Sequence, residues 1–561
     1  MKKIIAFLLA IAILSIFALS SPASASVAAL TVKSNIAMSD NADDPTVNDS
    51  TQSVTLEFSE PLNFSTIAGN VKLYMVKAAG EQAEVPSVKN FDRNAPTLLT
   101  IARKDGTKFT AGDVYKITVG GRVKSVNGAS LEKEFAGYFA VNYSLKLDGE
   151  GIAELNKKRS LIICVSDIHL GADNAYSEFY RNEKAFADLM GRIRQSPDVK
   201  ELVIAGDLVD EWFVPARVDT FRGKDQADFV KRVAAAHKPS IDALNAIIRD
   251  GKIKVTYVPG NHDILITAED IESILPGISQ ARDVRGLGVY SPADRPEIAV
   301  EHGHRYNYFC APDPISNRSI TGTDSILPPG YFFTRIATAS IVEKRPPAGY
   351  VIPPVTDNRL SDSQTMLYLY YQSFKDVLTN LPVREKFDEK FIKTNIDGYT
   401  ADYSLSDVFP FQSVPNGPIE VKLYAGAQDT WEQRQKANLV PVMIPGRTAI
   451  ANAAFSTDLD EKSESQYFKN PASNKRIVVF GHTHVPLVKA STNTKSQKTI
   501  YANSGTWIDH NPAGPTMDFV VITLPKSGDA AAGFVNLYKY SNEGTITRFS
   551  ESQAITGLNQ K

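Results

Sequence analysis

Two patterns of hydrophobic positions divide the chain. Over about residues 26–145, apolar and polar residues alternate in short runs, as at 54–58, 71–75 and 115–119. Such alternation is typical of strands that bury one face. Turn-forming pairs such as Asn127-Gly128 separate the runs, and no helical stripe lies between them. The pattern therefore predicts an all-β, two-sheet sandwich for this region.

From about residue 159 the apolar residues form nearly unbroken runs, which are typical of strands buried on both faces. Five such runs lie at 161–165, 202–205, 255–258, 298–300 and 477–480. Amphipathic segments at about 177–194 and 224–249 predict helices between the first three runs. Further apolar runs near the end of the chain predict a strand-rich closing sheet. Strands that alternate with helices indicate an α/β layered core over about residues 159–545.

A segment of about residues 311–474 interrupts this core. Apolar residues at 366, 369, 370, 374, 377 and 378 have helical spacing, with Asp362 placed to cap the start and Pro382 to stop the end. A second helix is predicted around Phe333 and Ile336. The two helices form either a lid over the site described below or an insertion that packs only on itself.

The first residues have the pattern of a targeting segment. Lys2 and Lys3 precede an apolar run, and small residues follow at 23–25. We interpret residues 1–25 as a cleavable secretory signal. An uncleaved anchor is the alternative, but a span needs about 20 apolar residues and Ser15 interrupts the run. No later run is long enough to cross a membrane, so we expect a secreted, periplasmic or cell-surface protein with no transmembrane span in the mature chain.

Composition narrows the class of protein. The 561 residues are 43% hydrophobic, and 61 Lys and Arg nearly balance 63 Asp and Glu. These values exclude a disordered polyelectrolyte and give no strong nucleic-acid signal. Of the two cysteines, Cys164 lies in an apolar strand pattern and Cys310 in a loop context. Cys164 is predicted to be a core residue, and a disulfide between the two is the alternative.

Every one of the five apolar runs is followed by residues of metal-ligand type. The clusters are Asp167-Ile168-His169, Gly206-Asp207-Leu208-Val209-Asp210, Gly260-Asn261-His262-Asp263, His302-Gly303-His304 and Gly481-His482-Thr483-His484. They contain six of the eight histidines in the chain. Loops at the carboxyl ends of strands in an α/β sheet converge on one ligand site. The clusters therefore predict a single metal-binding site.

The order of these motifs, closed by Asn503-Ser504-Gly505-Thr506-Trp507, resembles the calcineurin-like metallophosphoesterase superfamily over about residues 159–540. The resemblance implies an α/β four-layer sandwich, with central mixed sheets flanked by helices. It also implies two divalent metal ions about 3.5 to 4 Å apart. His, Asp and Asn ligands are suitable for Mn, Fe, Zn or Co. By position, Asp167, His169 and His484 would hold one ion, and Asn261, His302 and His482 the other. Asp207 would bridge the two.

The resemblance also implies a reaction. Two divalent ions and two ligand carboxylates leave a charge of about +2, which suits a phosphate dianion, and a metal-bridging hydroxide would be the nucleophile. His262, paired with Asp210, would protonate the leaving oxygen or stabilise charge on the phosphoryl group. A loop cap is the alternative for Asp210. Arg305 is expected either to bind phosphate or to lie on the surface.

The expected function is hydrolysis of phosphate mono- or diesters, with a phosphorylated small molecule, a lipid or a nucleotide sugar as substrate. Glu211-Trp212 stands where protein Ser/Thr phosphatases have Arg-Gly, which disfavours that activity. UDP-diacylglucosamine pyrophosphohydrolases are similar in their motifs but usually have Asp where this chain has His304. The alternative is a non-catalytic surface binding or adhesion protein with a degenerate phosphoesterase domain.

The region before the core carries a second resemblance. Residues 56–61 and 111–119 resemble immunoglobulin-like domains of bacterial surface-layer and secreted proteins. The resemblance implies an N-terminal immunoglobulin-like sandwich over residues 26–145. Its expected role is spacing or attachment to the cell envelope.

Overall fold

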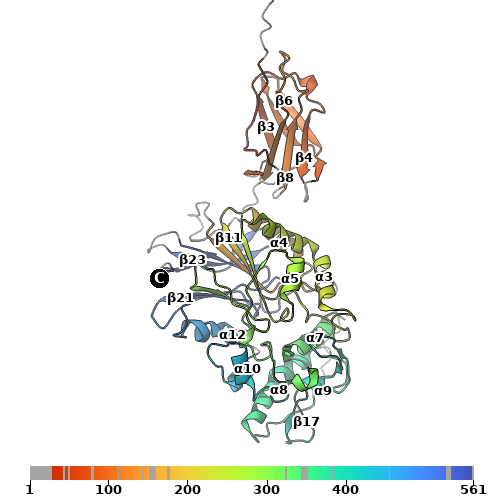
Figure 1. The fold of residues 1–561 in the computed structure, drawn as a ribbon, viewed down its shortest axis with the longest axis vertical. Helices are drawn as coiled ribbons and strands as arrows, with labels where there is room; N and C mark the ends of the chain where they lie inside the picture. The colour runs from red at the N-terminus through yellow and green to blue at the C-terminus, as the bar shows by residue number, and fades with distance from the viewer. Residues whose placement is uncertain are drawn as a thin grey trace, which may run out of the picture. The chain divides into compact units, whose positions relative to one another are not determined.

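The computed structural model describes residues 28–558, except for 42–44, 49–50, 77–80, 111–112, 142–144, 146, 151–158, 174–176, 323–324, 343–350, 382, 454 and 526–531. The predicted signal segment, residues 1–25, lies outside the described residues. The chain divides into two compact units, Met1–Tyr143 and Ser144–Lys561 (Figure 1).

The first unit is built from two β-sheets around one core. One sheet has the order β1 (Val32–Ser34), β3 (Ser53–Phe58), β7 (Ala95–Arg103) and β6 (Ser87–Asp92). The other has the order β2 (Thr46–Asn48), β9 (Phe135–Val141), β8 (Val114–Val119), β4 (Val71–Val76) and β5 (Gln82–Glu84). Leu56 of the first sheet and Leu73 and Ile117 of the second belong to the same buried cluster. The unit is thus a β-sandwich, and its alternating strands β3, β4 and β8 each bury one face.

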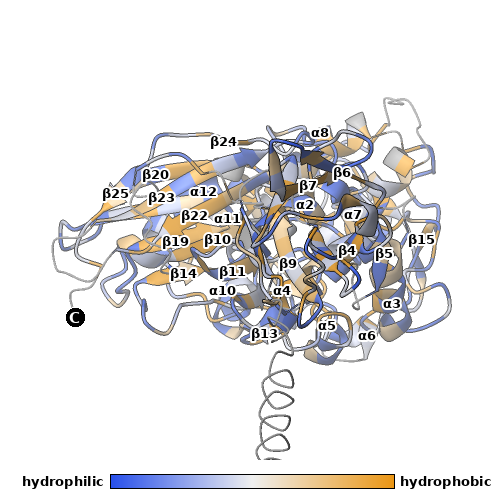
Figure 2. Ribbon diagram, turned by 90° about the horizontal axis from the view of Figure 1, so that it is seen from above, coloured by the Kyte–Doolittle hydropathy of each residue, from blue (hydrophilic) through white to orange (hydrophobic). Residues whose placement is uncertain are grey.

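The second unit contains two sheets that pack face to face. The larger sheet has the order β13 (Ser279–Gln280), β12 (Lys254–Val258), β11 (Val199–Ala205), β10 (Leu161–Val165), β22 (Asp518–Thr523), β23 (Gly533–Tyr540) and β24 (Ile546–Arg548), and β25 (Gln553–Ile555) also pairs with β23. The smaller sheet has the order β14 (Ile298–Val300), β19 (Ile477–Phe480), β21 (Lys498–Asn503) and β20 (Leu487–Thr492). Cys164, Ala205 and Val479 lie in the core between the sheets. Figure 2 shows β10, β19 and β22 as hydrophobic strands.

Helices cover the outer faces of both sheets. The larger sheet is covered by α2 (Glu183–Gln195), α3 (Gln226–Ala236), α4 (Lys238–Asp250) and α5 (Ala268–Ile274). The smaller sheet packs against α12 (Ser456–Ser463) and the π-helix η5 (Glu464–Phe468). This arrangement confirms the predicted four-layer α/β sandwich. Both cysteines are free.

The long helix predicted at 224–249 is two helices, α3 and α4, which meet at His237. Pro239 lies in the first turn of α4. A proline there loses no hydrogen bond, whereas inside a continuous helix it would clash with the preceding turn. The helix predicted at 177–194 likewise begins only at Glu183.

The insertion connects the neighbouring strands β14 and β19. Its helices α7 (Pro329–Val342), α8 (Asp362–Asn380) and α9 (Leu405–Val408) lie close together in Figure 1. Shorter elements complete it: α6 (Arg318–Thr321), β15 (Ile392–Lys393), β16 (Asp402–Tyr403), β17 (Phe411–Gln412), β18 (Ile419–Glu420), α10 (Trp431–Ala437) and α11 (Gly446–Asn452). The cap of α8 is Ser361, whose hydroxyl accepts from the Gln364 N–H, and not Asp362. Among the described residues, none of the helices combines the length and apolarity that crossing a membrane requires.

Candidate metal centre

The residues predicted for the site come from five loops, each at the carboxyl end of a strand. Asp167 and His169 follow β10, Asp207 and Asp210 follow β11, Asn261 and His262 follow β12, His302 follows β14, and His482 and His484 follow β19. In the larger sheet β10, β11 and β12 are parallel, and in the smaller sheet β14 and β19 are parallel. Their carboxyl ends therefore lie at the same edge of the two sheets. The structure brings the nine residues together there.

Asp167, His169 and His484 form the first group. The Asp167 Oδ1 to His484 Nε2 distance is 3.1 Å, and the Nε2 atoms of His169 and His484 are 3.2 Å apart. His169 Nε2 also lies 3.9 Å from Asp167 Oδ1. Three potential ligand atoms thus face one small volume.

Asn261, His302 and His482 surround Asp207 in the second group. His302 Nε2 lies 3.0 Å from Asn261 Oδ1 and 3.2 Å from Asp207 Oδ2. The ligand atoms of Asp207, His302 and His482 all lie within 4.8 Å of one another. Asp207 Oδ2 is also 3.7 Å from His169 Nε2 in the first group. Its carboxylate therefore lies between the two groups.

The donor atoms fit divalent cations. His302 Nδ1 is 2.9 Å from the Ala205 carbonyl, which can only accept, so Nδ1 carries a hydrogen and Nε2 faces the Asp207 and Asn261 oxygens, where it can bind a proton or a cation. His169 Nδ1 lies 2.7 Å from Asp210 Oδ2 in the same way. Lone pairs that face one another repel unless a proton or a cation lies between them. Carboxylate, imidazole and amide donors are ligands that transition metals take.

The electrostatics of the bare side chains agree with that geometry. Burial raises the pKa of Asp207, but the nearby imidazoles of His302 and His262 outweigh it and hold the pKa well below its ordinary value. Burial lowers the pKa of His302, but the carboxylates of Asp207 and Asp167 outweigh it and raise the pKa to about 9. The cluster therefore attracts positive charge.

Five of the predicted ligands have left-handed backbone. The φ angles are 52° at Asp167, 55° at His169, 51° at Asp207, 71° at His482 and 58° at His484. This conformation costs about 1 to 2 kcal/mol for a residue with a Cβ atom. Strain of this kind gathers at functional sites because the surrounding fold imposes it.

Glycines in the motifs let the loops approach one another. A Cβ atom on Gly260 would lie 2.1 Å from Asp207 Oδ1, and one on Gly481 would lie 2.5 Å from Asp167 Oδ2. Each glycine thus makes room for a predicted ligand on a different loop. The glycines are needed for packing of the centre, which the sequence motifs alone do not reveal.

Asp210 contacts two histidines at once. Its Oδ2 bonds to His169 Nδ1 at 2.7 Å and its Oδ1 to His262 Nδ1 at 2.8 Å. Oδ1 also accepts from the backbone N–H groups of Trp212 and Phe213. The orienting role and the loop cap considered as alternatives therefore coexist. The contact with His169 is one that the sequence did not indicate.

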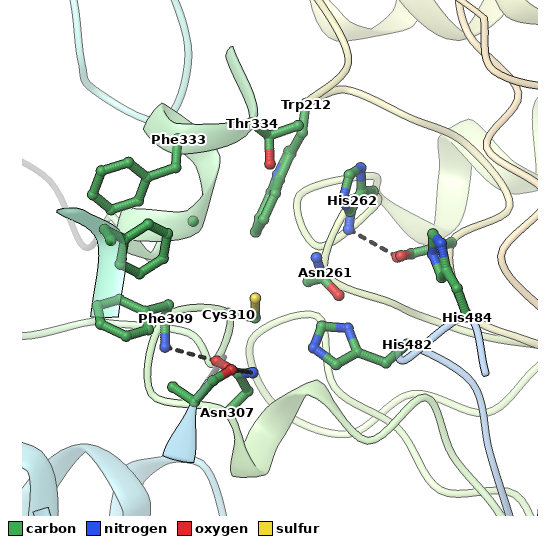
Figure 3. A pocket seen from close by; sticks show the side chains of 14 residues that line it. Trp212, Asn261, His262, Asn307, Phe309, Cys310, Phe333, Thr334, His482 and His484 are labelled. Carbon is green, nitrogen blue, oxygen red and sulfur yellow. Dashed lines mark hydrogen bonds between the residues drawn. The ribbon is translucent and has the colours of Figure 1, made fainter. Parts of the chain in front are cut away.

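A cavity of about 270 Å³ opens beside these residues. Asp207, Asn261, His262, His482 and His484 line one side of it. Trp212, Phe309 and Phe333 of α7 line the other side (Figure 3), and Phe374 of α8 also lines the cavity. Residues of the insertion thus line this cavity and do not pack only on one another. Phe333 and Phe374 were predicted as helix positions but not as site residues.

Arg305 has neither of its expected roles. It is buried, its Nε donates to Glu301 at 3.0 Å and its Nη2 donates to Asp283 at 2.7 Å. These carboxylates hold the guanidinium in the fold, and it does not line the cavity. His304 is also buried, and burial together with the charge of His302 keeps its pKa well below the ordinary value. It is a neutral residue that packs beside His302, with ring centroids 5.3 Å apart.

Comparison with known proteins finds a family similarity over part of this centre. Residues 160–333 match the family model for calcineurin-like phosphoesterase. This match lies within the second unit and confirms the resemblance seen in the motif order. The search of curated proteins found no match.

Several solved structures are similar at low identity. The purple acid phosphatase PPD1 from yellow lupin (Lupinus luteus) is 10% identical over 94% of this chain and 74% of that chain, with a TM-score of 0.24. Vps29 from Chaetomium thermophilum is 9% identical over 71% of this chain and 98% of that chain, with a TM-score of 0.22. The N-terminal part of the bacterial S-layer protein SbsC is 16% identical over 21% of this chain and 24% of that chain, with a TM-score of 0.16. The match thus spans about a quarter of that S-layer chain.

Proposed function

We propose that this protein is a metal-dependent phosphoesterase that hydrolyses phosphate mono- or diesters. The observation that supports this most is the convergence of seven ligand-type residues from five loops, with their donor atoms turned toward one another beside a cavity. None of the seven expected positions is replaced by a residue that cannot bind a metal.

The proposed ligands form two sets that share Asp207. Asp167, His169 and His484 would hold one divalent ion, and Asn261, His302 and His482 the other. Two such ions would supply Lewis acidity toward a phosphoryl oxygen and would acidify water. Mn, Fe, Zn and Co all suit this donor set.

His262 is proposed to act on the leaving group. Its Nδ1 is held by Asp210, so the other ring nitrogen remains for substrate. Its side chain is 15% exposed and lines the cavity. With Nδ1 held in this way, the other ring nitrogen is oriented to pass a proton to the leaving oxygen.

Export and attachment are part of the same proposal. The pattern of residues 1–25 supports secretion, and the β-sandwich of the first unit would serve as a spacer or as an attachment module on the cell envelope.

The variant Asp207→Asn tests the assignment. It keeps the size of the side chain but removes the charge between the two ligand groups. We expect metal content to fall below about two ions per chain. Turnover of 4-nitrophenyl phosphate or bis(4-nitrophenyl) phosphate under Mn(II) should fall more than about 100-fold, because even the loss of a residue that only hydrogen-bonds to a metal ligand lowers metal affinity or activity about 10- to 100-fold.

Asp402→Asn is the matched control, since Asp402 is exposed on β16 and does not line the cavity. It should leave metal content and turnover unchanged. Full turnover in Asp207→Asn would refute the ligand assignment. A wild-type protein that binds no metal would favour the binding or adhesion alternative.

A further inference from the structure

The cavity beside the proposed centre has an aromatic wall, formed by Trp212, Phe309, Phe333 and Phe374. Phe333 and Phe374 stack with ring centroids 4.1 Å apart and 14° between the planes. Phe309 meets Phe374 edge to face at 4.6 Å. Figure 3 shows Phe309 and Phe333 opposite Asn261, His262 and His482. The three phenylalanine rings therefore form one apolar surface on the side of the cavity that faces the polar residues.

The aromatic wall begins at the residue proposed to protonate the leaving group. The Trp212 ring stacks on the His262 ring, with centroids 4.8 Å apart and 28° between the planes. The backbone N–H of Trp212 also donates to the Asp210 carboxylate. A leaving oxygen within reach of His262 would therefore place its organic group beside Trp212.

The charge of the residues that line the cavity also favours an apolar group over a charged one. The described residues that line it include no lysine and no arginine. The polar groups on the aromatic side are those of Asn307, Cys310 and Thr334, all neutral in form. A second phosphate group, as in a nucleotide sugar, would find no cationic side chain there. An apolar group would lose little solvation and would gain burial.

A buried arginine fixes the aromatic wall in place. Arg335 of α7 donates to the carbonyl oxygens of Val214 at 2.6 Å and Lys393 at 3.0 Å. Val214 lies two residues after Trp212, so the helix that carries Phe333 is tied to the segment that carries Trp212. The two ends of the wall therefore hold a fixed separation, and the cavity is formed before a ligand enters.

We infer that the ester bound at this centre carries an apolar group, an aromatic ring or an alkyl chain, on the oxygen that leaves. This inference rests on the proposed function and narrows it to one substrate class. A cavity of about 270 Å³ is at or below the small end of ligand pockets, which suits a single ring or a short chain beside the phosphate. The shared chemistry is found both in small soluble esters and in lipid phosphates.

The test uses binding of non-hydrolysable phosphonates to the full chain loaded with Mn(II), measured by calorimetry. Benzylphosphonate should bind at least about tenfold more tightly than methylphosphonate, since burial of an aromatic ring contributes that much or more. Equal affinity of the two phosphonates would overturn the inference. Butyl- and octylphosphonate separate the two sources, because affinity that continues to rise with chain length indicates a lipid phosphate.

Variants show where the preference originates. Phe374 is only half-buried, so Phe374→Ala should fold and should reduce the benzyl preference by about tenfold. Phe549→Ala removes an aromatic ring that is 48% exposed and outside the cavity, and it should leave the preference intact. An unchanged preference in Phe374→Ala would also overturn the inference.

Turnover separates this inference from the proposed function. Benzyl phosphate and glycerol 1-phosphate both release a primary alcohol, so their intrinsic reactivity is similar. Hydrolysis of both esters at equal kcat/KM would refute the inference of an apolar leaving group but would agree with the proposed phosphoesterase activity. Phosphonate binding without hydrolysis of any ester would leave the inference standing and refute the enzyme.

Discussion

Asp518 is a buried carboxyl group with an unusual environment at the start of β22. Within the described residues neither of its oxygens has a hydrogen-bond partner, and burial raises the pKa from 3.8 to about 7. The unfolded chain ionises this group above about pH 4, whereas the folded chain keeps the proton until about pH 7. Between these values the folded state binds more protons, so its stability should fall as pH rises.

Asp518→Asn should remove that contribution. The wild-type free energy of unfolding is expected to lose roughly 2 to 4 kcal/mol between pH 4 and pH 8 through this group, and the variant should lose correspondingly less. Urea unfolding at several pH values measures the slope. Asp402→Asn, at an exposed position, should keep the wild-type slope, and an identical slope in Asp518→Asn would contradict the argument.

The sequence was sufficient to predict the ligand residues of the site, but not all of their contacts. The ligand types are readable because each follows a buried strand, and parallel strands end at one edge. Arg305 was misread because its partner Asp283 is 22 positions away and its burial depends on the tertiary fold. The double contact of Asp210 was missed for the same reason, since His169 is 41 positions away in sequence.

At the level of elements, the tether of α7 makes a prediction. Arg335→Met would leave the carbonyl groups of Val214, Pro215 and Lys393 without their buried donor. Each unsatisfied buried group costs about 1 to 3 kcal/mol, so we expect a loss of roughly 3 kcal/mol or more in unfolding free energy. Metal content should be preserved, because the proposed ligands lie on other loops.

Urea unfolding and metal analysis of the same samples check this prediction. Arg249→Met is the control, because Arg249 is an exposed residue near the end of α4. A variant Arg335→Met as stable as wild type would show that α7 is held by apolar packing alone.

The strands of the core and the two longest helices of the insertion were predictable, and the shorter elements of the insertion were not. Unbroken apolar runs gave β10 and β19 nearly to the residue, because strands buried on both faces need an apolar side chain at every position. Pro239 marks the break between α3 and α4 at His237. The prediction missed this break because the apolar residues on both sides of it have helical spacing. The rest of the insertion consists of short elements. Distant contacts join them to one another and to the longer helices, such as that of Arg335 in α7 with Lys393 in β15, and local patterns do not encode these contacts.

For the whole molecule, the division into two compact units predicts independence. All nine site residues belong to Ser144–Lys561. A chain consisting of residues 144–561 should fold, bind metal and hydrolyse the same phosphoesters with kcat/KM within about twofold of the full chain, because a unit with its own core can fold alone. Thermal unfolding and turnover measure both properties. Loss of metal binding in this shorter chain would show that the site depends on the first unit.

The two sides of the cavity differ in how freely they can change. Five of the seven proposed ligands lie on backbone that most side chains enter only with strain, and two of them lie against glycines that admit no added atom. Phe333 and Phe374 lie on ordinary helices, where many side chains are tolerated. Descendants of this sequence could therefore exchange one ester for another by altering the helices, while the hydrolytic apparatus is inherited unchanged.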